Sequence, residues 1–149
     1  MADPRNRIHL TAEVAAPPDQ VFDYFTNEFD EIWQGRMEQV RQGHDPGEPM
    51  GHGFVRRMHT PAGVLDEEIV THERPRLIEY KVLEEGKEPK FHNHLGRIEF
   101  TGTTGGGTRV DYTVRYDYRP PWQGPIVAAA MRMGWALRGR RRLAKRFAG

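Results

Sequence analysis

Histidines and tyrosines recur at two-residue spacing in the second half of the chain. In the run 91–101, His92 and His94 share their alternation with Ile98 and Phe100. Alternate residues of a strand point to the same face. In the run 108–118, one face collects Val110, Tyr112, Val114, Tyr116 and Tyr118. If these apolar sets face inward, imidazole and phenol groups enter one apolar interior, where they can orient or protonate a polar group of a ligand.

Two alternatives leave this chemistry outside the interior. Phe91, Leu95 and Arg97 occupy the other face of the first run and would line the interior if that run were turned over. The histidines could also lie at an exposed strand start. The inward orientation gives four candidate acid–base groups: His92, His94, Tyr116 and, from the acidic run described next, Glu68.

Carboxylates crowd one run of the chain, beside a run that carries arginines. The acidic residues are Asp66, Glu67, Glu68 and Glu73, and the arginines are Arg56 and Arg57. We expect cross-strand ion pairs on a solvated face, each contributing roughly 0.5 kcal/mol or less. The alternative is one buried carboxylate whose pKa is raised by desolvation, which could act as an acid or a base. Glu68 is the candidate, because it shares parity with Val64 and Val70.

His92 and His94 could also bind a metal ion, with a third ligand from His59 or Glu68. Nothing in the spacing fixes such a site, so we expect no metal and no cofactor. The chain has no cysteine, which excludes disulfides, thiolate metal sites and a cysteine nucleophile. It also carries no phosphate-binding loop, kinase motif set or dinucleotide-binding fingerprint.

The length of 149 residues predicts a single domain, 1–149. No run of eighteen apolar residues is present, so no membrane span is expected. The first residues lack the basic-then-apolar pattern of a secretory signal, and we expect a cytoplasmic protein.

The order of elements predicts an α+β fold. Prolines at 17 and 18 end a first strand and open a helix, because Pro is tolerated in the first helical turn. We expect strands over 8–14, 37–42, 54–59, 64–72, 77–83, 91–101 and 108–118, short helices over 18–27 and 29–33, a hairpin connection at 60–63, a polar loop at 84–89 and a long helix over 124–147. A curved antiparallel sheet of six to seven strands would then be covered by the long helix.

The predicted C-terminal helix carries two apolar sets. One contains Ile126, Met133, Leu137, Ala144 and Phe147, and the other contains Val127, Met131 and Trp135. A helix that is apolar on two sides is buried on both or lines a cavity. Three roles are considered for these sets, in order of preference: packing in the core, a gate for a ligand, and a dimer contact. The sequence leaves open whether the protein is a monomer or a homodimer.

The end of this helix is strongly basic. Residues 118–149 contain eight basic and no acidic residues, whereas the rest of the chain holds 14 basic and 21 acidic ones. Arg138, Arg141, Arg142 and Lys145 share one helix face. The helix dipole and stem packing account for them, and an anionic membrane surface is the alternative. Nucleic-acid binding is not expected, because the acidic body would repel phosphates.

Three segments carry a resemblance to a known family. They are residues 16–23, with Trp33 downstream, residues 73–80 and residues 107–112, followed by the closing helix. The chain resembles the START-like (SRPBCC) superfamily with its helix-grip fold, and within it the polyketide cyclase/dehydrase-like and coenzyme-Q-binding-like branch. The resemblance implies a ligand cavity between the sheet and the long helix, with no metal or redox cofactor.

Three functions follow as expectations. The first is binding of a hydrophobic or aromatic small molecule, lined by Tyr80, His92, His94, Tyr112, Tyr116, Met131 and Trp135. The second is a polyketide cyclase, aromatase or dehydratase, in which a Tyr or His donates to a carbonyl while a base removes a proton. The third is a membrane-peripheral lipid or quinone carrier that uses the basic helix end.

Overall fold

The computed structural model describes residues 3–33, 35–60, 63–84 and 90–148. In these residues seven strands form one antiparallel sheet, in the order β1-β7-β6-β5-β4-β3-β2. The strands are β1 (Asn6–Val14), β2 (Arg36–Arg41), β3 (Val55–Thr60), β4 (Gly63–Glu73), β5 (Leu77–Val82), β6 (Phe91–Gly102) and β7 (Thr108–Tyr118). The predicted loop 84–89 and connection 60–63 lie partly outside the described residues.

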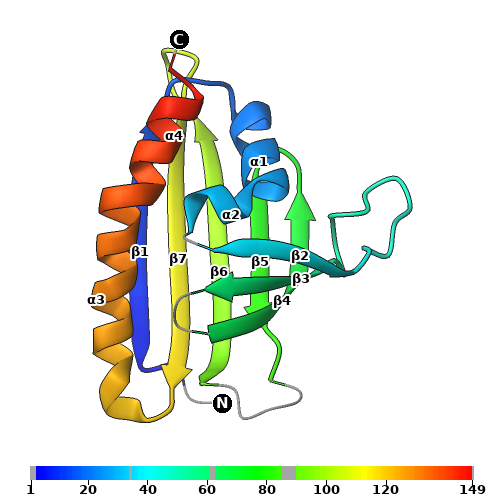
Figure 1. Cartoon of the computed structure of the whole chain (residues 1–149). Coiled ribbons are helices and arrows are strands. Elements are labelled where there is room, and N and C mark those ends of the chain that lie inside the picture. Colours follow the sequence, from blue (N-terminus) through cyan, green and yellow to red (C-terminus); the bar gives the residue numbers. More distant parts are fainter. Residues whose placement is uncertain (1–2, 34, 61–62, 85–89, 149) are drawn as a thin grey trace.

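Helices follow the first strand and close the chain (Figure 1). α1 (Pro18–Asn27) and α2 (Phe29–Ile32) come directly after β1, and α3 (Gly124–Gly134) runs alongside β1. The predicted α+β helix-grip order is therefore confirmed. None of the described helices is long and apolar enough to span a membrane.

The core lies on the concave face of the sheet. In β1, Ile8, Leu10, Ala12 and Val14 are buried and alternate with exposed residues. The alternating set predicted for β7 is buried as well. Full burial of each aliphatic side chain contributes about 1.5–3 kcal/mol, so this alternation fixes which face of each strand points inward.

A bulge in β6 changes the predicted pattern of that strand. The pairing with β7 shifts between His92 and Leu95, and Asn93 adopts a φ of 49°. As a result Phe91 packs beside His94, with their ring centroids 5.7 Å apart. His92 lies with other partners, which a strict two-residue period could not predict.

The predicted long C-terminal helix is confirmed, but it contains a π-helical turn that the prediction did not include. A π-helical segment, η2 (Trp135–Gly139), separates α3 from α4 (Arg140–Arg146). The Trp135 ring lies so close to Gly139 that a Cβ there would be 2.9 Å from a ring carbon. The Trp135 indole also donates to the Thr11 carbonyl at 2.9 Å, so the π-helical segment seats this large ring on β1.

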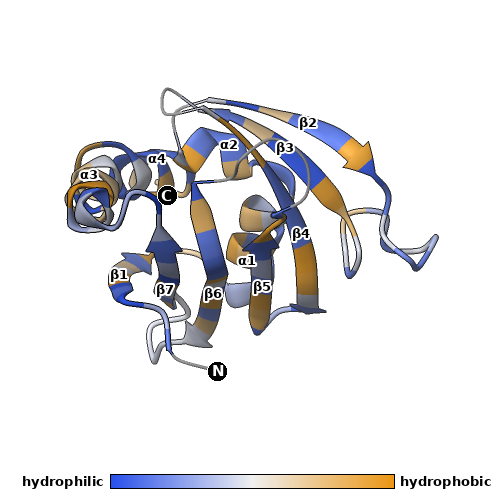
Figure 2. Cartoon of the chain, turned by 90° about the horizontal axis from the view of Figure 1, so that it is seen from below, coloured by the Kyte–Doolittle hydropathy of each residue, from blue (hydrophilic) through white to orange (hydrophobic). Residues whose placement is uncertain are grey.

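The two apolar sets of this helix have different environments. Ala128, Trp135 and Leu143 are buried against the sheet, and Val127 and Met131 are partly buried. In contrast Ile126, Met133 and Leu137 are exposed by 58%, 63% and 56%. The core role expected first for these three residues is therefore wrong. Figure 2, viewed from below, shows α3 at one edge of the molecule, away from β2 and β3.

Candidate functional site

An ion pair lies buried on the concave side of the sheet. Arg56 on β3 is the register partner of Glu67 on β4, and its Nε donates to Glu67 Oε1 at 2.9 Å. The two side chains are only 2% and 7% exposed. Water therefore has almost no access to either charge.

The guanidinium group packs against two aromatic rings. Arg56 Cζ lies 3.8 Å from the ring centroid of Phe29 and 4.8 Å from that of Tyr80. Such cation–π contacts stabilise a desolvated cation. Arg56 Nη2 is buried and has no hydrogen-bond partner in the part of the chain that the structure describes. One strong donor is thus left over inside an aromatic interior.

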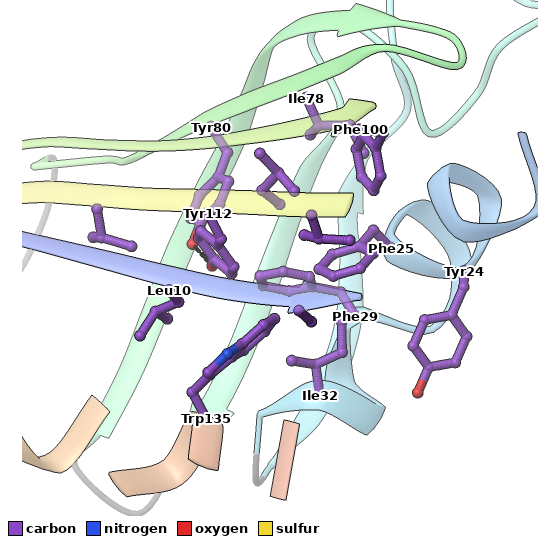
Figure 3. Packing of buried hydrophobic residues seen from close by; sticks show 14 of the residues in the cluster. Leu10, Tyr24, Phe25, Phe29, Ile32, Ile78, Tyr80, Phe100, Tyr112 and Trp135 are labelled. Atoms are coloured by element: carbon purple, nitrogen blue, oxygen red, sulfur yellow. Dashed lines mark hydrogen bonds between the residues drawn. The ribbon is translucent and has the colours of Figure 1, made fainter. Parts of the chain in front are cut away.

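Two tyrosines extend the cluster across the sheet. Tyr80 on β5 and Tyr112 on β7 point toward each other and share a hydrogen bond between their hydroxyl groups (Figure 3). Trp33 Nε1 donates to the Tyr112 hydroxyl at 3.3 Å. On β6, between the two strands, a Cβ at Gly96 would overlap the Tyr80 ring, so glycine makes room for this ring. We call Arg56, Glu67, Tyr80 and Tyr112 the buried polar cluster.

Burial determines the protonation of the cluster. Desolvation raises the pKa of Tyr80 well above its usual value, and it raises that of Tyr112 as well. Both phenols are neutral near pH 7. Desolvation also raises the pKa of the Glu67 carboxyl, and the Arg56 charge opposes this shift. The cluster can therefore offer neutral hydroxyl donors and one carboxyl group with a perturbed pKa.

His94 borders the cluster, whereas His92 does not. The His94 ring lies 5.4 Å from the Tyr80 ring, and its Nδ1 accepts a hydrogen bond of 3.1 Å from the Val82 amide. Burial, assisted by the Arg56 charge, lowers the pKa of His94 to about 3, so its imidazole is neutral. His92 instead places Nδ1 2.6 Å from Glu84 Oε1.

Of the other predicted lining residues, some contact the buried polar cluster and some do not. Trp135 packs edge-on against Tyr112 at 5.8 Å between ring centroids, so it joins the cluster's apolar wall. The Tyr116 hydroxyl donates to the Gly124 carbonyl at 2.7 Å and ties the start of α3 to the sheet. Met131 is partly buried at the margin of the core. The structure thus gathers Tyr80, Tyr112, His94 and Trp135.

The buried carboxylate is Glu67 rather than its neighbour Glu68. Glu68 is 21% exposed and lies 2.5 Å from Arg41 and 3.6 Å from Lys81. The parity argument took Val64 as an inward residue, but Val64 is 58% exposed.

The apolar neighbours of Glu67 and Arg56 in the sequence could have indicated that both side chains point inward. Glu67 lies between Leu65 and Ile69, and Arg56 between Phe54 and Met58. Each member of the pair therefore has apolar neighbours two residues away on both sides. Pairing on a more solvated face does occur for Arg57 and Asp66, at 2.8 Å.

The described residues contain no group of three His, Asp or Glu side chains that could hold a metal ion. His59, one proposed third ligand, pairs with Glu38 at 2.9 Å. His92 and His94 have separate partners, as described above. The ligands considered for a metal site are therefore not brought together in the described part of the chain.

Two hollows among the described residues lie at the surface. One, of about 340 Å³, opens on the outer face of the sheet, and Leu95 and Arg97 are among its lining residues. The alternative in which these two residues face the interior is therefore wrong. The other, of about 270 Å³, lies between α1 and α4, next to Tyr24 and Phe147. The cavity between sheet and helix stays a prediction, because aromatic side chains fill the interior described here.

The sequence matches a family model described as polyketide cyclase / dehydrase and lipid transport, over residues 5–147. No curated protein matches the chain.

Several solved structures share the fold. A START superfamily protein from Mycobacterium smegmatis aligns with a TM-score of 0.72 at 15% identity, covering 95% of this chain and 97% of that one. A protein from Thermobifida fusca aligns at 0.70 and 21% identity, covering 95% and 93%. DynU16, a putative protein in the dynemicin biosynthetic locus, aligns at 0.62 and 22% identity, covering 95% of this chain but 47% of its own.

Proposed function

Because the chain belongs to the polyketide cyclase / dehydrase and lipid transport family, with a START-like helix-grip fold, we propose that it binds a hydrophobic or aromatic small molecule inside the sheet. Arg56 Nη2 would anchor an oxygen atom of this molecule. The unpartnered Nη2 carries the proposal, since a buried donor normally has an acceptor.

The surroundings of Arg56 favour one chemical class of ligand. Phe29, Trp33, Tyr112 and Trp135 supply flat apolar contact area, which suits a fused-ring or polyunsaturated molecule. The remaining guanidinium N–H can only donate, so the polar group of a ligand bound to Arg56 must accept a hydrogen bond. A carbonyl, a carboxylate or a phenolate meets this requirement.

We expect the ligand to enter past Trp33. This ring is only partly buried, and its bond to Tyr112 is long for an N–H donor. Moving Trp33 would remove one of the two hydrogen bonds of the Tyr112 hydroxyl, which would keep its bond to Tyr80, without breaking the Arg56–Glu67 pair. The predicted lining residues Tyr80, His94, Tyr112 and Trp135 would then contact the ligand, with Met131 at the margin.

A cyclase is the second candidate, favoured by the perturbed pKa of Glu67 beside hydroxyl donors. In an aldol cyclisation, Glu67 would take a proton from carbon next to a ketone, and the carbon would attack a second carbonyl of the same chain. Tyr112 would protonate the new alkoxide and recover its proton from Glu67. In the dehydration that follows, Glu67 would remove the remaining proton from the same carbon and deliver it to the hydroxyl, which leaves as water. Positioning of the folded chain would supply most of the rate.

Native mass spectrometry tests the binding proposal. The protein is purified without denaturation from cells that produce it naturally, next to two double variants. Arg56→Met/Glu67→Met removes the buried pair without stranding a charge. Arg57→Met/Asp66→Met removes the neighbouring, more exposed pair and is the matched control.

We expect a small-molecule adduct on the wild type and on the control, and at least tenfold lower occupancy in the variant that lacks Arg56. Equal occupancy in all three proteins would contradict the anchor. Turnover of a model polyketone by the wild type, lost in Glu67→Gln, would favour the cyclase.

A further inference from the structure

We propose that α3 and η2 form a docking surface for an anionic lipid membrane. Its apolar part consists of Trp122, Ile126, Met133 and Leu137, which we call the apolar ridge. These side chains are 68%, 58%, 63% and 56% exposed, although each is large and apolar. Isolated exposed apolar residues are ordinary, but Ile126, Met133 and Leu137 share one helix face, and Trp122 lies in the short 3-10 helix η1 (Pro121–Gln123) directly before α3.

The ridge lies opposite the face that packs on the sheet. Ile126, Met133 and Leu137 are spaced by seven and four residues, so they share one side of the helix, and the exposed Ala130 fills the space between them. The buried Ala128 and Trp135 occupy the other side. The ridge therefore points away from the sheet, in agreement with the outer position of α3 in Figures 1 and 2.

Cations accompany the ridge. Arg132, Arg140, Arg141 and Lys145 are exposed, and none of them lies within 4.0 Å of a carboxylate among the described residues. Arg142 and Arg146 differ, because they approach Glu31 at 3.3 Å and Glu28 at 3.6 Å. The basic group predicted from the sequence thus changes: Arg142 turns toward α2, and Arg138 is partly buried.

The charge pattern selects the partner. Residues 118–149 contain no acidic residue, so a second copy seated on this ridge would bring cations against cations. A lipid surface with anionic headgroups accepts apolar side chains below its phosphates and cations at them, which is the pattern shown by this helix. This proposal does not depend on the interior ligand site.

A flotation assay at 0.1 M salt tests the membrane-docking proposal. The large unilamellar vesicles consist of phosphatidylcholine alone or of phosphatidylcholine with 30% phosphatidylglycerol. The ridge variant is Met133→Gln/Leu137→Gln, matched by Val40→Gln/Val64→Gln, which changes exposed apolar residues on β2 and β4. The cation variant replaces Arg132, Arg140, Arg141 and Lys145 by Gln. Its control replaces the exposed Arg5, Arg7, Arg36 and Arg115, so net charge changes equally. Circular dichroism verifies that each variant is folded.

We expect the wild type and both controls to bind the anionic vesicles at least tenfold more tightly than neutral ones. The ridge variant should bind the anionic vesicles about tenfold more weakly than the wild type. The cation variant should lose the preference for anionic lipid, because each cation near such a surface contributes about fivefold to the affinity. Equal binding by the ridge variant and its control, or no binding by the wild type, would overturn the proposal. So would a wild-type dimer in sedimentation that the ridge variant converts to monomer.

Discussion

Arg56 donates its Nε–H to Glu67 at 2.9 Å, whereas its Nη2 meets no acceptor among the described residues. The pair joins β3 to β4 in a place that water does not reach. The guanidinium group packs against the rings of Phe29 and Tyr80, which also contact each other, so its orientation is restricted before any ligand arrives. A preorganised donor of this kind binds an acceptor with little additional ordering cost.

Removal of one partner of this pair should be costly. We expect Arg56→Met to lower the free energy of unfolding by about 3–5 kcal/mol, because the Glu67 carboxylate would stay buried without its cation. Arg56→Met/Glu67→Met should recover most of this loss. Urea denaturation at pH 7 measures both values, and Arg57→Met, in a half-exposed pair, should cost less than about 1 kcal/mol. A single variant as stable as the double one would show that the pair is not sealed from water.

His94 should make the protein sensitive to acid. Its pKa of about 3 in the folded state lies below the ordinary value of 6.5, so the unfolded chain binds a proton that the folded one does not. The stabilisation is complete above pH 6.5 and is lost as pH falls from 6.5 toward 3. One pKa unit corresponds to about 1.4 kcal/mol, so protonation of His94 should lower the free energy of unfolding by roughly 2 kcal/mol between pH 7 and pH 5.

Urea denaturation at pH 7 and pH 5 measures this difference. His94→Gln should reduce the pH dependence of the free energy of unfolding by the same amount, because the amide oxygen of the new side chain can still accept the hydrogen bond from the Val82 amide. His52→Gln, on an exposed loop, should leave the dependence unchanged. An equally steep dependence in His94→Gln would contradict the role of burial.

Gly96 should be intolerant of a side chain. A Cβ there would overlap the Tyr80 ring, so Gly96→Ala should displace Tyr80 and cost about 1–3 kcal/mol. Near-ultraviolet circular dichroism and thermal unfolding should both report the change. Gly105→Ala is the matched control, because no atom lies within 4 Å of its Cβ. Equal stability of the two variants would mean that the Tyr80 ring is not confined.

Tyr116 should prove structural. Tyr116→Phe leaves the Gly124 carbonyl without its donor and should cost about 1 kcal/mol, measured by urea denaturation. Ligand retention in native mass spectrometry should not change, whereas Tyr112→Phe should reduce it. Loss of the ligand in Tyr116→Phe at unchanged stability would restore Tyr116 as a binding residue.

The fold could be predicted because its signals are local. Alternating apolar residues set the inward faces of β1 and β7, and Pro17 and Pro18 mark the passage into α1. Those signals depend on periodicity and backbone restriction, which the sequence displays directly. The π-helical turn within the last helix was not predicted, since it depends on how the Trp135 ring fits against Gly139.

The site could be predicted only in part. Tyr80, Tyr112 and His94 were found because strand alternation points them inward. Arg56 and Glu67 were assigned to a solvated face, because charged residues are rarely buried unless they pair across strands. That pairing depends on the register of β3 with β4, which the sequence does not reveal. The bulge at Asn93, which separates His92 from His94, is equally a property of the assembled sheet.

Affinity for two matched probes tests most directly whether Arg56 anchors a ligand oxygen. 2-Acetylnaphthalene and 2-ethylnaphthalene have nearly the same shape, but only the first carries a carbonyl. We predict that the wild type, titrated by calorimetry, binds the ketone roughly tenfold or more tightly than the hydrocarbon, and that this difference disappears in Arg56→Met/Glu67→Met. Equal affinity of the wild type for both probes, or a preference that survives in the double variant, would contradict the account.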